Sequence, residues 1–350
     1  MKPKLTIGDR EISRQSPPFI IAEMSGNHNQ SLERAMKIVE EAALAGVDAI
    51  KLQTYTAETM TLDVDREDFF IKEENSLWKG NSLYNLYKQA YTPWEWHEPI
   101  FERCKELGLI AFSSPFDHTA VDFLEELDVP AFKIASFENS DLPLIRKVAS
   151  TGKPMIISTG MASLSELDET VREVEKSGNH QLALLKCTST YPASPENTNL
   201  ATIPHMRDLF GYEVGLSDHT MGVGAAVAST VLGATIIEKH FTLSRAEGGV
   251  DSAFSLEPKE LKQLVEETKR AWLALGEVTY GPLNEEKSSM RFRRSLYVTQ
   301  DLRAGHELTE EDVRIIRPGY GLSPKYYDLV LGKKITKDLA KGTPLSWDFI

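Results

Sequence analysis

The sequence contains very little cysteine. Only two of its 350 residues are cysteines, Cys104 and Cys187, which excludes the disulfide framework that holds small secreted domains together. The two lie far apart in the chain, so the CxxC spacing of zinc and redox sites is excluded as well. We therefore expect two free thiols and a reducing compartment, the cytoplasm.

The sequence also lacks a long apolar run and an excess of positive charge. No run is long enough to cross a bilayer, and the first four residues lead into a polar segment without the apolar core of a signal peptide. The formal net charge of -13 argues against nucleic acid or an anionic membrane as a partner. The chain is nevertheless 41% hydrophobic, which is enough for a sizeable core.

The charge is unevenly distributed along the chain. From Glu285 to the end there are 12 Lys and Arg against 10 Asp and Glu, whereas the preceding part has 27 against 42. An acidic body with a slightly basic tail, in a chain long for one domain, indicates two domains. We predict a first domain over residues 1–280, a linker over 281–290 and a second domain over 291–350.

Eight short apolar runs recur along the first domain, each followed by polar residues. They cover residues 19–22, 49–53, 109–112, 131–136, 155–157, 182–186, 212–216 and 234–237. Their hydrophobicity is continuous rather than alternating, as expected of parallel strands buried on both faces. Eight such units with short links predict an α/β fold, a TIM (β/α)8 barrel, rather than an open doubly wound sheet.

Several helices between these runs have clear end signals. Residues 31–45 are amphipathic and end at Gly46, and a last helix over Pro258–Leu275 is expected to close the barrel. TPWE at residues 92–95 and SLSE at residues 163–166 both match a capping box. A long insertion over residues 55–91 follows a strand's carboxyl end, and it is either an active-site lid or a solvated decorative loop.

The predicted second domain contains a short repeat. DLRAGHELT at residues 301–309 aligns with DLAKGTPLS at residues 338–346, and β-rich runs precede the two copies at 296–299 and 333–336. Two similar halves of this size predict a small β-clip unit.

Polar side chains at the carboxyl ends of the eight strands should converge on one cavity. They are Glu23, Lys51, Gln53, Ser114, Lys133, Ser136, Ser158, Ser189, Ser217, His219, Glu238 and His240. Two lysines and a ring of hydroxyls suit a small anion such as a phosphate or a carboxylate. Two imidazoles from adjacent strands can hold a divalent metal with positions left for water and substrate.

Each of these side chains also has a purely structural interpretation. A single histidine more often serves as a hydrogen-bonding residue than as a metal ligand. A lysine within an apolar run can be part of a buried ion pair. For Cys187 we favour a small buried side chain over a nucleophile, because no partner histidine and asparagine are evident.

Eight motifs together resemble the sialic acid synthase family over almost the whole chain. They are IAEMSGNH at 21–28, KLQT at 51–54, SSPF at 113–116, KIAS at 133–136, STGM at 158–161, CTSTYP at 187–192, GLSDHT at 215–220 and EKHF at 238–241. IRPGYG at 316–321 resembles the antifreeze-like (SAF) domain of that family. Within the family, TPWEWH at 92–97 and GVDSAFSL at 249–256 resemble the branch of pseudaminic acid synthases. N-acetylneuraminate synthases tend to carry Asn at the position of Ser189.

The resemblance implies a TIM barrel followed by a SAF domain, and a defined reaction. Phosphoenolpyruvate would condense with 2,4-diacetamido-2,4,6-trideoxy-L-altrose to give pseudaminic acid and phosphate. C3 of phosphoenolpyruvate attacks the sugar aldehyde, a cation develops at C2, and water traps it. The resulting intermediate loses phosphate by C–O cleavage.

The resemblance also implies a role for each site residue. His219 and His240 would hold a divalent cation (Mn2+, Mg2+ or Co2+), and Glu23 and Glu238 would handle protons or steady the cation at C2. Phosphoenolpyruvate would be bound by Lys51, Ser114, Lys133, Ser136, Ser158, Ser189 and Ser217. The sugar would contact Gln53, Tyr191, Asp251 and, in a domain-swapped homodimer, Arg317 of the partner subunit.

Three other functions stay open from the sequence. The nearest is the same chemistry on N-acetylmannosamine or a related amino sugar, as in N-acetylneuraminate synthases. A second is a Schiff-base aldolase that uses Lys133. A third is a carbohydrate-binding module without catalytic activity.

Overall fold

The computed structural model describes residues 4–72 and 77–350. The start of the expected polar leader, residues 1–3, and residues 73–76 of the insertion lie outside the described residues. The chain divides into two compact units, Met1–Gly276 and Glu277–Ile350. No helix within the described ranges is long and apolar enough to span a membrane.

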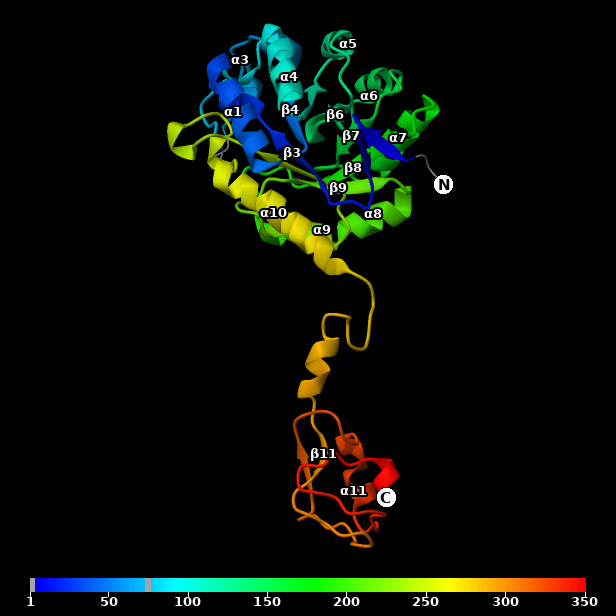
Figure 1. Ribbon diagram of the computed structural model, residues 1–350. Coiled ribbons are helices and arrows are strands. Elements are labelled where there is room, and N and C mark those ends of the chain that lie inside the picture. Colours follow the sequence, from blue (N-terminus) through cyan, green and yellow to red (C-terminus); the bar gives the residue numbers. More distant parts are fainter. Residues whose placement is uncertain (1–3, 73–76) are drawn as a thin grey trace. The chain divides into compact units, whose positions relative to one another are not determined.

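The first unit is a closed barrel of eight parallel strands with helices around it (Figure 1). The strands are β3 (Phe19–Glu23), β4 (Ala49–Thr54), β5 (Ile110–Pro115), β6 (Phe132–Ile134), β7 (Met155–Ser158), β8 (Leu182–Cys187), β9 (Glu213–Asp218) and β10 (Ile236–His240). They pair in sequence order, and β10 closes the barrel on β3. All eight coincide with the apolar runs, so the predicted TIM barrel is confirmed.

The barrel helices follow the strands in the expected alternation. They are α1 (Leu32–Ala45), α4 (His97–Glu106), α5 (His118–Glu126), α6 (Leu142–Ala149), α7 (Leu164–Lys176), α8 (Thr202–Phe210), α9 (Gly224–Val231) and α10 (Pro258–Leu275). Gly46 ends α1 in the left-handed conformation at φ 85°, as expected of a helix C-terminus. Ser163 and Glu166 form the predicted capping box of α7.

The capping box predicted at residues 92–95 is wrong. The segment forms a 3-10 turn, η3 (Trp94–Trp96), and α4 begins only at His97. Thr92 Oγ1 lies 3.1 Å from His28 Nε2. The Thr92 hydroxyl therefore contacts the ring of His28, which is distant in sequence, and it does not cap α4.

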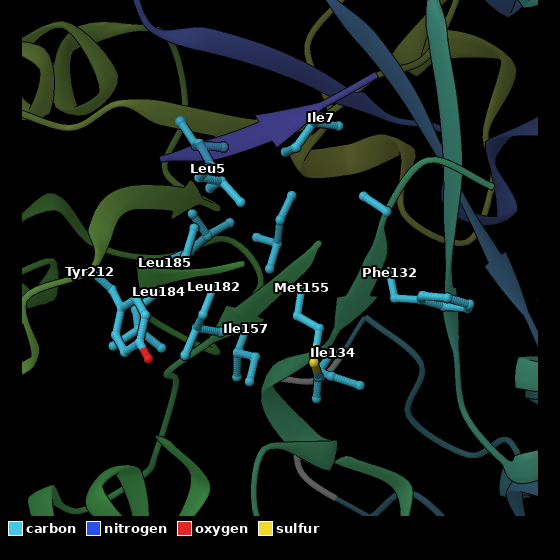
Figure 2. Close-up of a cluster of buried hydrophobic side chains, with 14 of the residues drawn as sticks. Leu5, Ile7, Phe132, Ile134, Met155, Ile157, Leu182, Leu184, Leu185 and Tyr212 are labelled. Carbon is cyan, nitrogen blue, oxygen red and sulfur yellow. The ribbon is translucent and has the colours of Figure 1, made fainter. Parts of the chain in front are cut away.

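A hairpin that the sequence did not reveal closes the amino-terminal end of the barrel. It pairs β1 (Leu5–Ile7) with β2 (Arg10–Ile12), and the backbone N–H of Thr6 donates to Gln181 Oε1, just before β8. Leu5 and Ile7 belong to the same buried cluster as side chains of β6, β7 and β8 (Figure 2). The hairpin seals this end with apolar side chains, so the carboxyl ends of the strands are left for the site.

The described part of the insertion after β4 includes the α-helices α2 (Ala57–Met60) and α3 (Leu83–Ala90) and a 3-10 turn, η2 (Glu67–Phe69). Trp78 Nε1 donates to the carbonyl of Val250 at 2.9 Å. Gln30 Nε2 donates to the carbonyls of Gln89 and Tyr91 at 3.0 and 2.7 Å. These bonds attach the described part of the insertion to loops at the carboxyl ends of the strands.

The second unit is small and has its own core. Its sheet pairs β11 (Ser295–Val298) with β12 (Val313–Ile316), and Leu296, Leu308 and Val330 pack inside it. The two copies of the sequence repeat meet at Leu302 and Leu339, whose backbones exchange hydrogen bonds of 2.8 and 2.9 Å. The β-rich run at residues 333–336 does not form a strand. It contributes an isolated bridge between Lys334 and Glu307. The predicted linker overlaps a 3-10 turn, η8 (Lys287–Phe292), in a stretch of exposed residues.

A buried ion pair joins β9 to β10 on the outer face of the barrel. Lys239 Nζ lies 2.8 Å from Asp218 Oδ2, and the two side chains are 1% and 0% exposed. Lys239 also donates to the carbonyl of Thr220, and the N–H of Thr220 donates to Asp218 Oδ1. The pair therefore ties together the two strand ends that carry His219 and His240.

We expect Lys239→Met to lower the free energy of unfolding by about 3–5 kcal/mol, because it leaves the Asp218 carboxylate buried without its counter-ion. Urea denaturation followed by circular dichroism measures this loss. The control is Lys37→Met, which removes an exposed ion pair with Glu33 and should leave the unfolding midpoint unchanged. Equal midpoints for the two variants would contradict the prediction.

Candidate active site

A cavity of about 650 Å³ opens at the carboxyl ends of the barrel strands. Twelve predicted site residues line it: Lys51, Gln53, Lys133, Ser136, Ser158, Ser189, Tyr191, Ser217, His219, Glu238, His240 and Asp251. Glu23 and Ser114 lie behind the wall, where both contact Lys51. Arg317 belongs to the second unit, where it is exposed just after β12. The structure thus gathers the predicted residues of the first unit into one place.

Two lysines and two glutamates form a buried network on the cavity floor. Lys51 Nζ lies 2.6 Å from Glu23 Oε2 and 3.6 Å from Glu238 Oε1. Lys133 Nζ lies 2.9 and 3.1 Å from the two carboxylate oxygens of Glu238. The four side chains are at most 5% exposed, so the charges depend on one another rather than on water.

Neutral groups complete this network. Lys51 donates to Ser114 Oγ at 3.1 Å, and Ser217 Oγ donates to Glu238 at 3.2 Å. Gln53 Nε2 donates to Glu23 Oε1 at 3.0 Å. The sequence left open whether these lysines bind an anion or form buried ion pairs. The structure shows that both form ion pairs at the cavity wall.

The surroundings of the two glutamates shift their pKa values in opposite directions. Burial and the negative charge of Glu238 raise the pKa of Glu23 to about 7, against the attraction of Lys51. Burial also opposes ionisation of Glu238, but Lys133 and Lys51 outweigh it and lower its pKa to about 2. With Glu23 protonated, two ammonium groups face one carboxylate, and this excess of positive charge favours a bound anion.

Three serines and a glycine form the next part of the wall. The N–H of Gly160 donates to Ser136 Oγ at 3.2 Å, and Asn139 Nδ2 donates to the carbonyls of Ser158 and Gly160. A methyl group on Gly160 would overlap the hydroxyls of Ser136 and Ser189. Ser158 Oγ is buried without a hydrogen-bond partner among the described residues. This part of the wall therefore presents hydroxyl groups to a ligand at close range.

The two histidines lie side by side, with ring centroids 5.4 Å apart. His219 Nδ1 is 2.9 Å from the carbonyl of Thr188, so it donates there and leaves Nε2 as the lone-pair nitrogen. His240 Nδ1 is buried and makes no hydrogen bond to a described residue, and Asp251 Oδ2 lies 3.7 Å away.

A divalent cation would fit this pair of histidines. The two imidazoles and the neighbouring carboxylate would supply part of a ligand set, and oxygen ligands from substrate and water would supply the donors that Mn2+ and Mg2+ prefer. Among residues 4–72 and 77–350, no group of three or more His, Cys, Asp or Glu side chains is placed so that it could hold a metal ion. A cation held here by the two imidazoles would therefore need further ligands from substrate and water.

Sequence reasoning missed several residues of the site. Ser25, two positions beyond Glu23, donates to Asp251 Oδ2. Glu138, in the 3-10 turn after β6, lines the cavity, and its Oε2 is buried without a partner among the described residues. Burial raises the pKa of Glu138 to about 7. Both residues lie just past strand ends. Extending the predicted strand ends at Glu23 and Ser136 by two residues would have included them.

Cys187 is buried, as expected, but it also lies in the cavity wall. Its Sγ is 3.9 Å from His219 Nδ1 and 3.8 Å from Ser189 Oγ. Burial alone would raise the pKa of the thiol, but His219, Ser136 and Lys133 lower it to about 7. The thiol therefore contacts polar groups of the site and does not serve for apolar packing alone.

Comparison with known proteins decides the family. The model of the NeuB family matches residues 38–280, and that of the SAF domain matches residues 293–350. The chain belongs to the NeuB family. The resemblance seen in the sequence motifs and the predicted SAF domain are thus both confirmed.

Relatives in the NeuB family cover almost the whole chain. A pseudaminic acid synthase of Campylobacter jejuni is 45% identical over 330 residues, 93% of this chain and 95% of the relative. One of Helicobacter pylori is 44% identical over 336 residues, 95% of this chain and 98% of the relative. The crystal structure of an N-acetylneuraminic acid synthetase from Leptospira borgpetersenii is similar with a TM-score of 0.73 and 33% identity, covering 84% of this chain and 97% of that one.

The raised pKa of Glu23 predicts a defined pH dependence of stability. Its ordinary pKa is 4.5 and its pKa in the folded protein is about 7, so between these pH values the folded protein holds a proton that the unfolded chain releases. The stabilising contribution of Glu23 is therefore fully present below pH 4.5 and is lost as the pH rises through 7.

We expect the free energy of unfolding of the native protein, minus that of Glu23→Gln, to fall as the pH rises from about 4.5 to about 7. Urea denaturation of both proteins at half-unit steps of pH measures the difference. A difference independent of pH in this window would mean that Glu23 titrates normally.

Proposed function

We propose that this protein condenses phosphoenolpyruvate with 2,4-diacetamido-2,4,6-trideoxy-L-altrose to form pseudaminic acid and phosphate. The observation that carries the proposal is the 45% identity, over 93% of the chain, to a relative named for this reaction. The cavity supports it, because one end suits a trianionic phosphoester and the other suits a sugar.

The charged end of the cavity accounts for binding of phosphoenolpyruvate. Lys51 and Lys133 would offer ammonium groups to its phosphate and carboxylate, and Ser136, Ser158 and Ser189 would offer hydroxyl groups. The amino groups are already held in place by Glu23 and Glu238. Binding therefore requires little ordering of side chains, which preserves affinity.

The histidines would hold a divalent cation beside the sugar aldehyde. A cation bound there supplies Lewis-acid polarisation of the aldehyde oxygen. Gln53, Tyr191 and Asp251 line the same region and would position the open-chain sugar.

The glutamates account for the second half of the reaction. As C3 of phosphoenolpyruvate bonds to the aldehyde carbon, the aldehyde oxygen gains the carbonyl electron pair and takes up a proton, while positive charge develops at C2, where the Glu238 carboxylate would stabilise it. Water adds to C2, and its proton would pass by way of Lys51 to Glu23, which must be ionised at that step and whose pKa of about 7 suits proton exchange at neutral pH. Breakage of the C2–O bond then releases phosphate, so one water is consumed per phosphate formed.

The alternatives have less support. N-acetylneuraminate synthesis fits the same cavity, but the similar synthetase from Leptospira borgpetersenii is only 33% identical. In a Schiff-base aldolase Lys133 would be the nucleophile, and burial does lower its pKa. Its Nζ is, however, held by both oxygens of Glu238. A binding module without activity would not need a buried network of four charged groups.

Phosphate release tests the proposal. We expect the protein with Mn2+ to release phosphate from phosphoenolpyruvate when the altrose sugar is present and at least about 10-fold more slowly with N-acetylmannosamine. EDTA should abolish release, and added Mn2+ should restore it. Faster release with N-acetylmannosamine would favour the alternative sugar, release resistant to EDTA would remove the cation from the proposal, and borohydride trapping of pyruvate would favour the aldolase.

A domain-swapped homodimer in the cytoplasm is part of the same proposal. Its support is the charge asymmetry between the acidic barrel and the basic tail. In such a dimer the partner subunit's Arg317 would contact the sugar.

Arg317→Ala should then raise the KM for the sugar about 10-fold or more, while the KM for phosphoenolpyruvate changes less than about 2-fold. The matched control is Arg314→Ala, another exposed arginine of the same unit, which should change neither constant. Equal increases in both KM values for Arg317→Ala would count against the contact.

A further inference from the structure

One wall of the cavity is apolar, and it comes from the insertion after β4. Leu83, Leu86, Tyr87 and Ala90 of α3 all line the cavity. Their spacing of three, four and seven residues puts them on one face of the helix. The apolar stripe of α3 therefore faces the space that a ligand would fill, in place of a conventional core.

Other side chains continue this surface. Met60 and Ile71 of the insertion line the same cavity, as do Tyr55 and Phe116. The Tyr55 ring meets the rings of Tyr87 and Phe116 edge to face, with centroids 5.9 and 5.2 Å apart. We call these eight residues the apolar wall: Tyr55, Met60, Ile71, Leu83, Leu86, Tyr87, Ala90 and Phe116.

Helix α3 is held by contacts with other parts of the chain. Ser82 caps its first turn, and the carbonyl of Gln89 accepts a hydrogen bond from Gln30 at 3.0 Å. Ala90 packs so closely on Gly26 that a methyl group there would lie 3.2 Å from the Ala90 backbone. The apolar wall is therefore a preformed surface.

The insertion that carries most of the apolar wall also contacts the loops that carry the proposed sugar contacts. The Trp78 ring lies 5.9 Å from that of Tyr191, and its Nε1 donates to Val250, the neighbour of Asp251. A sugar with its aldehyde carbon at the histidines would direct its other end away from the charged floor. That end would meet the apolar wall.

We propose that the apolar wall is a subsite for the deoxygenated end of the sugar, and that it selects a C6 methyl group over a C6 hydroxymethyl group. The proposal rests on the proposed function, because it concerns the same substrate. A methyl group gains from contact with leucine, methionine and aromatic carbon. A hydroxyl group packed against the leucine, isoleucine, alanine and phenylalanine side chains of the wall would lose its water partners and find no acceptor there, since the only hydroxyl groups of the wall are those of Tyr55 and Tyr87.

The test uses two sugars that differ in one oxygen, 2,4-diacetamido-2,4,6-trideoxy-L-altrose and its 6-hydroxy counterpart. Phosphate release gives kcat/KM for each. An apolar pocket discriminates such a pair by about 10- to 100-fold, and we expect a preference of that size for the deoxy sugar in the native protein.

Two variants place an amide on the apolar wall. Leu83→Gln and Met60→Gln, the second nearly equal in volume, should each reduce the preference about 10-fold and change the KM for phosphoenolpyruvate less than about 2-fold. Leu83→Met keeps the surface apolar and should keep the preference. Leu62→Gln is the matched control, because Leu62 belongs to the same insertion, is 63% exposed and does not line the cavity.

Each outcome is informative. Equal use of both sugars by the native protein, or an unchanged preference in a folded Leu83→Gln or Met60→Gln protein, would overturn the subsite. An equal loss of preference in Leu62→Gln would overturn it too. Faster turnover of the 6-hydroxy sugar by the native protein would also overturn the proposal, because the wall would then favour the hydroxymethyl group over the methyl group. If it uses neither sugar, the proposed function fails, a result distinct from turnover without preference.

Discussion

The pairing of Lys51 and Lys133 with Glu23 and Glu238 is the interaction on which the rest of the site depends. Four ionisable groups out of contact with bulk water cost several kcal/mol each unless every charge has a partner. Here Glu238 is held by both lysines, and Glu23 is held by Lys51. Removal of Glu238 would leave Lys133 without its counter-ion, and removal of Lys51 would leave Glu23 without its own, so the strands that carry them must keep their register.

The barrel provides that register. Glu23 and Lys51 are direct partners in the pairing of β3 with β4, and Glu23 faces His240 in the pairing of β3 with β10. Because side chains alternate along a strand, Glu238 and His240 point into the cavity while Lys239 points outward. The same alternation puts Ser217 and His219 inside and Asp218 outside. The outer ion pair and the inner site therefore lie on opposite faces of the same pair of strands.

Strands and strand-end residues could be predicted from the sequence because both follow from local pattern. A run buried on both faces is apolar throughout, and parallel strands deliver their next residues to one end. Features that depend on distant contacts could not be predicted. Thr92 matches a helix cap, but His28, distant in sequence, takes its hydroxyl. The β1–β2 hairpin is too short to have a pattern, and its burial depends on a cluster formed by the barrel.

The role of the insertion shows the same limit within the site. Its amphipathic helix α3 could have covered a core or a partner, and the sequence does not say which. In the structure its apolar face lines the same cavity as Lys51, Lys133 and Glu238. An apolar wall beside charged groups excludes water and lowers the local dielectric response, which strengthens the attraction between the lysines and an anion. In the proposed reaction the apolar wall and the charged floor would act on the same step, since one would reduce competing water and the other would offer the anion fixed partners.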